Sequence, residues 1–304
     1  MVTEKYLIIA ATALSLSACS NDKEYRIEKA PVAAKVTASI EGVSTRASNS
    51  SWDQGDAIGI SCSSATTNYK NMKYVTALGD GNFEHADGEP MGIFFQTANE
   101  TVNFSAYYPF AGTNGTEAGV ISNVTTDDQT KQKQFDFLFA DNVTASRESY
   151  VVRFTGEHPF NHKMCRLIIN LSTSADADFK AEDVFAGSYS ISGIKHSGSF
   201  NTATGEATAT GDASANWDIT AVPTDDAANA TRTYSMIFYP QGENATITFY
   251  ATIAGQVYTC QINPNLTAGK SNNYTIITRK TGLKVSSCSI NNWEDANTGN
   301  IEAQ

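Results

Sequence analysis

The sequence predicts an all-β protein that folds as two antiparallel β-sandwiches in tandem. Apolar and polar residues alternate with a period of two in almost every patterned segment, and clusters of Gly, Asn, Asp or Ser separate these segments. No stretch has the pattern of an amphipathic helix of three turns. A chain of 304 residues that is 41% hydrophobic can fill two cores, because all-β domains commonly have roughly 100 to 150 residues.

The chain begins with an export signal. The apolar run YLIIAATALSL, residues 6–16, is too short to span a bilayer, and small residues follow it up to Cys19. The segment LSAC resembles a bacterial lipobox, in which the cysteine carries the lipid. We therefore expect residues 1–18 to be a lipoprotein signal peptide and Cys19 to be the anchor in the outer membrane. An ordinary cleaved signal peptide is the alternative.

The next segment predicts a first strand followed by a loop that is sensitive to proteases. Residues 31–42, PVAAKVTASIEG, place five apolar residues on one face of a strand: Val32, Ala34, Val36, Ala38 and Ile40. The small polar run STRASNSS follows and holds a single arginine, Arg46. An ordinary surface loop is the alternative interpretation of this run.

Further strands and two domains are predicted along the rest of the chain. Alternation indicates strands around residues 102–108, 135–139, 234–238 and 247–253. One short helix is expected within residues 176–186, a hairpin with long loops within 199–229, and disorder over 123–134. We place the domain boundary near residue 150, which gives an N-terminal sandwich of residues 47–150 and a C-terminal sandwich of residues 151–304.

Four cysteines follow Cys19 in the sequence. Cys62, Cys165 and Cys260 share the phase of their apolar neighbours, so we expect them to face the cores as small hydrophobic residues. A disulfide between Cys260 and Cys288 remains open, because disulfides form in exported proteins.

No catalytic residue, metal site or cofactor is predicted, and we expect the protein not to be an enzyme. His158 and His162 have the spacing of a helical zinc pair, but Pro159 separates them and no third ligand is evident. The acidic pairs Asp53 with Asp56 and Glu294 with Asp295 would suit a glycosidase only if they converged across a cleft. A formal net charge of −11 makes nucleic acid an unsuitable partner.

Several motifs along nearly the whole chain resemble the fimbrillin superfamily, the type V pilins of anaerobic gut and oral bacteria. The most specific are the lipobox at Cys19 and the segment WDQGDAIG, residues 52–59, which follows TRAS. Looser matches are AYYPF up to Phe110, FNHKMCRLIINL from Phe160, and SINNW, residues 289–293.

This resemblance implies a fold and a way of working. Members have two transthyretin-like sandwiches and are exported as lipoproteins, and an arginine-specific protease cuts them at the position between Arg46 and Ala47. In the family, His162 belongs to a structural motif. Residues 19–46 would then form a lipidated leader with a removable strand. Loss of this strand opens an apolar groove and an unpaired edge, into which another fimbrial subunit can insert a strand.

The C-terminus offers a candidate donor strand. Leu283 and Val285 share one face, and Cys288 with Ile290 share the other phase, so a bulge at Ser286 and Ser287 would align them. The alternative is that this segment is the last strand of the second sandwich. A free donor would indicate a stalk subunit, and a strand held in its own sheet would indicate a tip or accessory subunit.

A second function remains open beside that of a fimbrial subunit. A surface lipoprotein of this kind could bind a glycan or a host protein through an exposed aromatic platform such as Trp217 or Trp293. The alternative is that these tryptophans pack in a core or at an edge.

Overall fold

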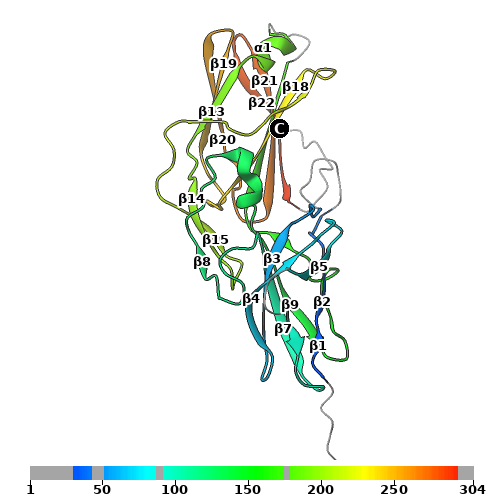
Figure 1. Cartoon of the computed structure of the whole chain (residues 1–304). Coiled ribbons are helices and arrows are strands. Elements are labelled where there is room, and N and C mark those ends of the chain that lie inside the picture. Colours follow the sequence, from blue (N-terminus) through cyan, green and yellow to red (C-terminus); the bar gives the residue numbers. More distant parts are fainter. Residues whose placement is uncertain (1–29, 43–50, 87–91, 174–178, 294–304) are drawn as a thin grey trace, which may run out of the picture. The chain divides into compact units, whose positions relative to one another are not determined.

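The computed structural model describes residues 30–42, 51–86, 92–173 and 179–293. The chain divides into two units, Met1–Ala30 and Pro31–Gln304, and all elements described below belong to the second. Nearly all of them are β-strands, so the predicted all-β class is confirmed (Figure 1). The two helical segments of the described residues, the 3-10 helix η1 (Gln129–Gln134) and α1 (Ala181–Phe185), are short, and neither is long and apolar enough to cross a membrane.

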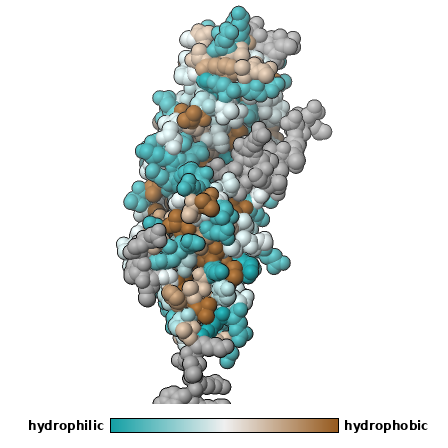
Figure 2. Space-filling view, turned by 45° about the vertical axis from the view of Figure 1, so that its right-hand side comes forward, coloured by the Kyte–Doolittle hydropathy of each residue, from teal (hydrophilic) through white to brown (hydrophobic). Residues whose placement is uncertain are grey.

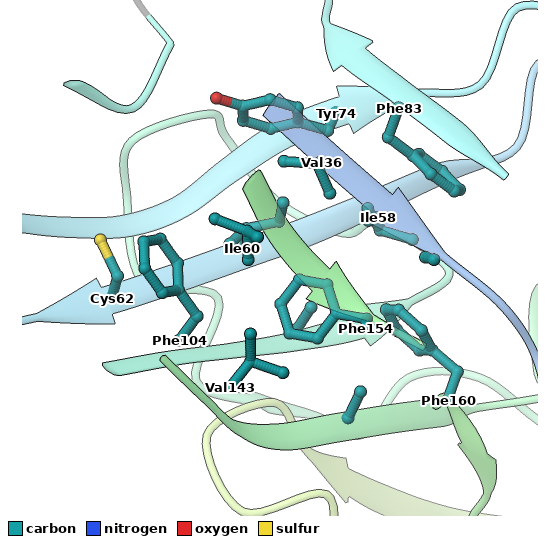
Figure 3. Packing of buried hydrophobic residues seen from close by; sticks show 14 of the residues in the cluster. Val36, Ile58, Ile60, Cys62, Tyr74, Phe83, Phe104, Val143, Phe154 and Phe160 are labelled. Atoms are coloured by element: carbon teal, nitrogen blue, oxygen red, sulfur yellow. The ribbon is translucent and has the colours of Figure 1, made fainter. Parts of the chain in front are cut away.

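The first sandwich consists of one sheet of eight described strands in the order β10-β2-β5-β4-β3-β7-β9-β11. The strands are β2 (Lys35–Ala38), β3 (Ala57–Ser63), β4 (Asn68–Val75), β5 (Asn82–His85), β7 (Thr101–Tyr108), β9 (Leu138–Ser146), β10 (Val151–Phe154) and β11 (Asn161–His162). A short ladder of β1 (Val32–Ala33) with β6 (Phe94–Phe95) accompanies them. Val36, Ile60 and Phe154 come from distant strands of this sheet but share one hydrophobic cluster, and β10 also contacts β9. The sheet therefore folds over onto itself and encloses the cluster (Figure 3).

Two facing sheets form the second sandwich, with the orders β17-β18-β12-β21-β22 and β16-β13-β19-β20. Their strands are β12 (Cys165–Ser172), β13 (Ser188–Ser192), β16 (Trp217–Asp218), β17 (Thr224–Asp226), β18 (Thr231–Phe238), β19 (Ile247–Ile253), β20 (Gln256–Ile262), β21 (Lys270–Arg279) and β22 (Gly282–Asn292). Alternate residues of β12 and β19, such as Leu167 and Phe249, are fully buried in one cluster between the sheets. A third small sheet joins β8 (Val120–Ile121), β14 (Ser197–Asn201) and β15 (Ala207–Thr210). The β14–β15 pair is a hairpin that overlaps the segment 199–229, in which one was predicted.

Residues beyond the expected boundary at residue 150 still contribute to the first hydrophobic cluster. Val152 and Phe154 are buried in the first cluster because β10 pairs with β2 in the first sheet. Phe160 belongs to the same cluster, whereas Cys165 already belongs to the second. The first cluster therefore reaches Phe160, and the expected domain boundary stays a prediction.

A third cluster contains residues from strands of both sandwiches. Its aromatic members include Phe137 and Phe200, whose rings stack with centroids 4.5 Å apart. The strand predicted over residues 135–139 is wrong before residue 138, because β9 begins at Leu138. All three phenylalanines of this segment, Phe135, Phe137 and Phe139, are nevertheless buried in the third cluster.

The predicted disorder over residues 123–134 is also wrong. The side chain of Gln129 is buried, and its amide nitrogen donates hydrogen bonds to the carbonyl oxygens of Thr126, at 2.7 Å, and Ile237, at 2.8 Å. The Ile237 N–H donates to the Gln129 Oε1 in return. Although residues 123–134 are polar in composition, the hydrogen bonds of Gln129 fix this segment to β18.

The four described cysteines are free thiols, including Cys260 and Cys288. Cys62 and Cys165 are buried and Cys260 is half-buried in the second cluster, as their phase predicted. Burial raises the pKa of Cys62 to about 12 and that of Cys260 to about 11, and it also raises the pKa of Cys165. These thiols therefore stay protonated at neutral pH and pack as hydrophobic residues.

The carboxylate of Glu100 fixes the turn between β3 and β4. It accepts hydrogen bonds from the backbone N–H of Thr66, at 2.7 Å, and from the hydroxyl of Thr67, at 2.9 Å, as well as from the hydroxyl of Ser64. Desolvation alone would raise the pKa of Glu100, but the hydrogen bonds from Ser64, Thr66 and Thr67 outweigh it and lower this pKa to about 2.

We expect Glu100→Gln to lower the free energy of unfolding at pH 7 by about 1 kcal/mol, the scale of a hydrogen-bonded charge on a partly exposed loop. Because the pKa is lower in the folded state, this contribution is complete above the ordinary pKa of 4.5 and is lost as the pH falls through about 2. Urea unfolding at pH 7, 4 and 3 should show the difference between the two proteins shrinking. Glu84→Gln, on the exposed face of β5, is the control, and a difference that does not change with pH would contradict the assignment.

Candidate functional site

The leader strand, residues 32–40, has an inner position in the first sheet. Its β2 part lies between β10 and β5, parallel to β10 and antiparallel to β5. Further backbone hydrogen bonds follow on the β10 side, where the Ser39 N–H donates to the Phe154 oxygen, at 2.9 Å, and the Glu41 N–H donates to the Phe160 oxygen, at 2.8 Å. Without this strand the sheet would have two unpaired edges facing one gap.

The side chains of the leader strand alternate between the core and the surface. Val36, Ala38 and Ile40 are 3%, 4% and 9% exposed and belong to the first cluster. Val32 and Ala34 on the same face are half-buried, whereas Ala33 and Lys35 between them are exposed. Figure 3 shows Val36 among the labelled core residues of the other strands. The strand therefore supplies part of the core, and its loss would leave an apolar groove.

Trp52 contacts the leader strand at Ala38. The indole N–H of Trp52 donates a buried hydrogen bond of 2.9 Å to the Ala38 carbonyl oxygen. Three aromatic rings surround the indole edge to face, Phe83, Tyr108 and Phe160, with centroids 5.1, 5.5 and 5.2 Å away. The first residue of the WDQGDAIG segment is thus a fixed hydrogen-bond donor to the leader strand.

The expected cut site and the expected lipid attachment site lie outside the described residues. Arg46 and Ala47 fall between Gly42 and Ser51, and Cys19 falls within residues 1–29. Both remain expectations from the sequence.

The candidate donor strand, β22, is the outer strand of its sheet and pairs antiparallel with β21 along its length. Thr275 lies opposite Ser287 and Ile276 lies opposite Val285, which leaves Ser286 as an extra residue. This confirms the bulge predicted at Ser286 and Ser287. Leu283, Val285 and Cys288 are half-buried against the second cluster, whereas Ile290 is 43% exposed.

Trp293, at the end of β22, packs against residues of β11 and β12. Its ring stacks on His162 with centroids 3.9 Å apart, and the guanidinium carbon of Arg166 lies 4.9 Å from the ring. His162 Nδ1 lies 2.9 Å from a carboxylate oxygen of Asp136. Burial lowers the pKa of Arg166 to about 10, although the charge of Asp136 acts in the opposite direction. His162 is 3% exposed, so the expectation of a structural histidine is confirmed.

Comparison with known proteins identifies the family of this chain. Residues 45–293 match the model of a protein family described as fimbrillin-like. The chain belongs to the fimbrillin-like family. The resemblance found in its motifs is therefore confirmed.

Relatives of this fimbrillin-like chain include a curated protein of Bacteroides uniformis named "Putative fimbrium subunit Fim1C". It is 30% identical over 320 residues, which cover 97% of each chain. Two solved structures of proteins assigned to cell adhesion are each 25% identical. The one from Bacteroides ovatus has a TM-score of 0.70 and covers 87% of this chain and 99% of its own. The one from Bacteroides uniformis has a TM-score of 0.68, with 86% and 98% covered. This family membership points to a structural role.

Asp53 and Asp56 each have a partner close to the turn before β3. Asp56 accepts hydrogen bonds from the Asp53 N–H, at 2.7 Å, and from the Tyr108 hydroxyl, at 3.1 Å, while Asp53 pairs with Lys133. These contacts fix the turn before β3. Glu294 and Asp295 lie outside the described residues.

The two candidate tryptophan platforms differ in their exposure. Trp293 is 3% exposed, and Trp217 is half-buried with its N–H donating to the Asp127 oxygen at 3.0 Å. His196 covers Trp217, with ring centroids 4.7 Å apart. Of the two alternatives, Trp293 is a packing residue, whereas Trp217 is half-buried and packs in part against His196.

Sequence reasoning missed three parts of the groove around the leader strand. These are the parallel partner β10, the donor Trp52, and Gly81, whose oxygen accepts a hydrogen bond of 2.8 Å from the Ala38 N–H. The alternation of Val152 and Phe154 was a usable signal for a strand, but alternation does not identify the partner of a strand.

Proposed function

We propose that this chain is a structural subunit of a cell-surface fimbrium, exported as an outer-membrane lipoprotein with the lipid on Cys19. An arginine-specific protease cuts between Arg46 and Ala47, the leader strand departs, and a strand of another subunit takes its place. The fimbrillin-like family and the relative named as a fimbrium subunit support assembly with other subunits and a location on the cell surface.

The inner position of β2 supports strand replacement most directly. A first strand at the edge of a sheet could leave without opening a core, but β2 pairs on both sides and carries buried Val36 and Ala38. Its departure would expose two rows of backbone groups and an apolar gap, and this arrangement binds an added strand. On the face in Figure 2, most of the strongly hydrophobic side chains lie in the lower half, among hydrophilic ones.

The contacts of β22 favour a tip or accessory position in the fibre over a stalk position. As a donor, β22 would bring Leu283, Val285, Cys288 and Ile290 to the groove of the next subunit. Before β22 can do so, its ladder with β21 and the packing of Trp293 on His162 must break. These contacts favour a tip or accessory subunit, which accepts a strand without donating one, as the second candidate function.

Limited digestion of residues 20–304 with an arginine-specific protease tests the proposed function. We expect one early cut after Arg46, identified by intact mass, because the described arginines are held in ordered structure. Arg147 and Arg166 are buried, Arg232 pairs with Asp225, and Arg153 and Arg279 lie within β10 and β21. Mass also separates this cut from one after Arg26, which leaves the leader strand attached.

The size of the cut protein distinguishes the two positions in the fibre. Detergent-resistant ladders would indicate a stalk subunit, and a folded monomer that binds an added strand would indicate a tip or accessory subunit. A protein that resists the protease at Arg46, or that is cut and binds no strand, would contradict the proposed function. Uncut protein carried through the same steps is the control.

A further inference from the structure

The backbone of Ala38 is held from both sides. Its N–H donates to the Gly81 oxygen at 2.8 Å, and its carbonyl oxygen accepts the Trp52 indole N–H at 2.9 Å. One of these partners is a side chain, so the second bond does not belong to the regular ladders of β2 with β5 and β10. The backbone of Ala38 is therefore bound by a side chain in addition to its backbone partner.

The Trp52 donor stays in place when the strand leaves. Its ring is 7% exposed and is packed by Phe83, Tyr108 and Phe160, none of which belongs to the leader strand. In an empty groove its N–H would lose the Ala38 oxygen and face the groove, where the carbonyl oxygen of a new strand can replace that acceptor. The carbonyl must arrive at one particular place, and this requirement sets the register of an incoming strand.

There is no room for a side chain at Gly81, next to the Ala38 carbonyl oxygen. A Cβ at residue 81 would lie 2.5 Å from the Ala38 carbonyl oxygen and 3.7 Å from the Trp52 ring. Its φ of +81° is also a conformation that side chains other than glycine rarely adopt. The backbone of the strand therefore lies directly against Gly81.

The side chain at position 38 has little room to grow. Ala38 is 4% exposed, and its partner on β10 is Phe154, which is fully buried. Val36 lies opposite Phe83, and Ile40 bridges to Phe160. Two large apolar positions thus flank a small one, in a core where added volume displaces close-packed neighbours.

We propose that the groove selects the strand of its partner subunit by size and register. The accepted strand has inward-facing residues in the order large, small, large, and the carbonyl of its small residue receives the Trp52 N–H. This inference rests on the proposed function and specifies the partner of the same site. A strand shifted by two residues would place a large side chain at the small position, so Trp52 and the site of Ala38 together exclude it.

Binding of labelled peptides to the cut full-length soluble protein, measured by fluorescence anisotropy, tests this selection. The probe has the sequence of residues 31–42 of this chain. We expect the Ala38→Leu peptide to bind at least about tenfold more weakly, because it overpacks the small position. The Ala33→Leu peptide carries the same change on the exposed face and should bind within about twofold of the unchanged probe.

A variant of the protein tests the register donor separately. Trp52→Phe keeps an aromatic ring but removes the N–H, and we expect it to weaken binding of the unchanged probe about tenfold. Binding of the Ala38→Leu peptide as tightly as the unchanged probe would overturn the selection by size and leave strand replacement intact. Failure of the cut protein to bind any of the peptides would instead contradict the proposed function. The peptides are compared on the cut protein of unchanged sequence, so this comparison remains a valid test if the Trp52→Phe variant does not fold.

Discussion

Val36→Asp is expected to lower the free energy of unfolding of the uncut protein by about 3 kcal/mol or more, the scale for an unpaired charge in a core. Val36 is 3% exposed and lies in the first cluster opposite Phe83. A carboxylate there loses water and gains no cationic partner from its strand neighbours, since Lys35 lies on the opposite, exposed face. Urea unfolding at pH 7, followed by tryptophan fluorescence, measures the change.

Ala33→Asp is the matched control for this prediction. It adds the same charge to the same strand at an exposed position, so its effect should stay within about 0.5 kcal/mol. If the strand is replaced after the cut, Val36→Asp should have no effect on the assembled product, because the altered residue has been removed. Equal stability of the Val36→Asp and unchanged precursors would contradict the role of Val36 in the core.

The alternation of the leader strand and the bulge of β22 were predictable from the sequence because both are local patterns. Residues 32–40 alternate between core and surface as their apolar period requires. The apolar phase of β22 changes between Val285 and Cys288, and one extra residue, Ser286, accounts for it. Each pattern needs information from fewer than a dozen neighbouring residues.

The partners in the groove were not predictable, because they depend on contacts between distant segments. The pairing of β2 with β10 joins Val36 to Val152, and no local feature of YVVRF indicates that it belongs to the first sheet. The burial of Trp293 by His162 and Arg166 is another contact of this kind. Polar composition was also misleading for Gln129, whose side chain finds backbone partners on β18.

The inner position of β2 also explains why a covalent cut would control strand exchange. While the chain is continuous, the leader strand is tethered beside its own groove at an effective concentration on the order of millimolar. A strand from another subunit must compete with this internal strand. Cutting the tether lets the leader strand diffuse away, so a competing strand of similar affinity can then hold the groove.

Arg46→Ala is therefore expected to abolish assembly while it leaves the precursor folded. The substitution removes the cleavable arginine but leaves Val36, Ala38 and Trp52 in place, so the free energy of unfolding should match that of the unchanged precursor within about 0.5 kcal/mol. Treatment with the arginine-specific protease should then yield neither ladders nor binding of the leader-strand probe. Arg153→Ala is the control, because Arg153 is an exposed arginine on β10 next to the same groove, and this variant should assemble normally. Normal fibres from Arg46→Ala would show that the groove opens without a cut at this residue, and a precursor of lower stability would show that Arg46 contributes to the fold itself.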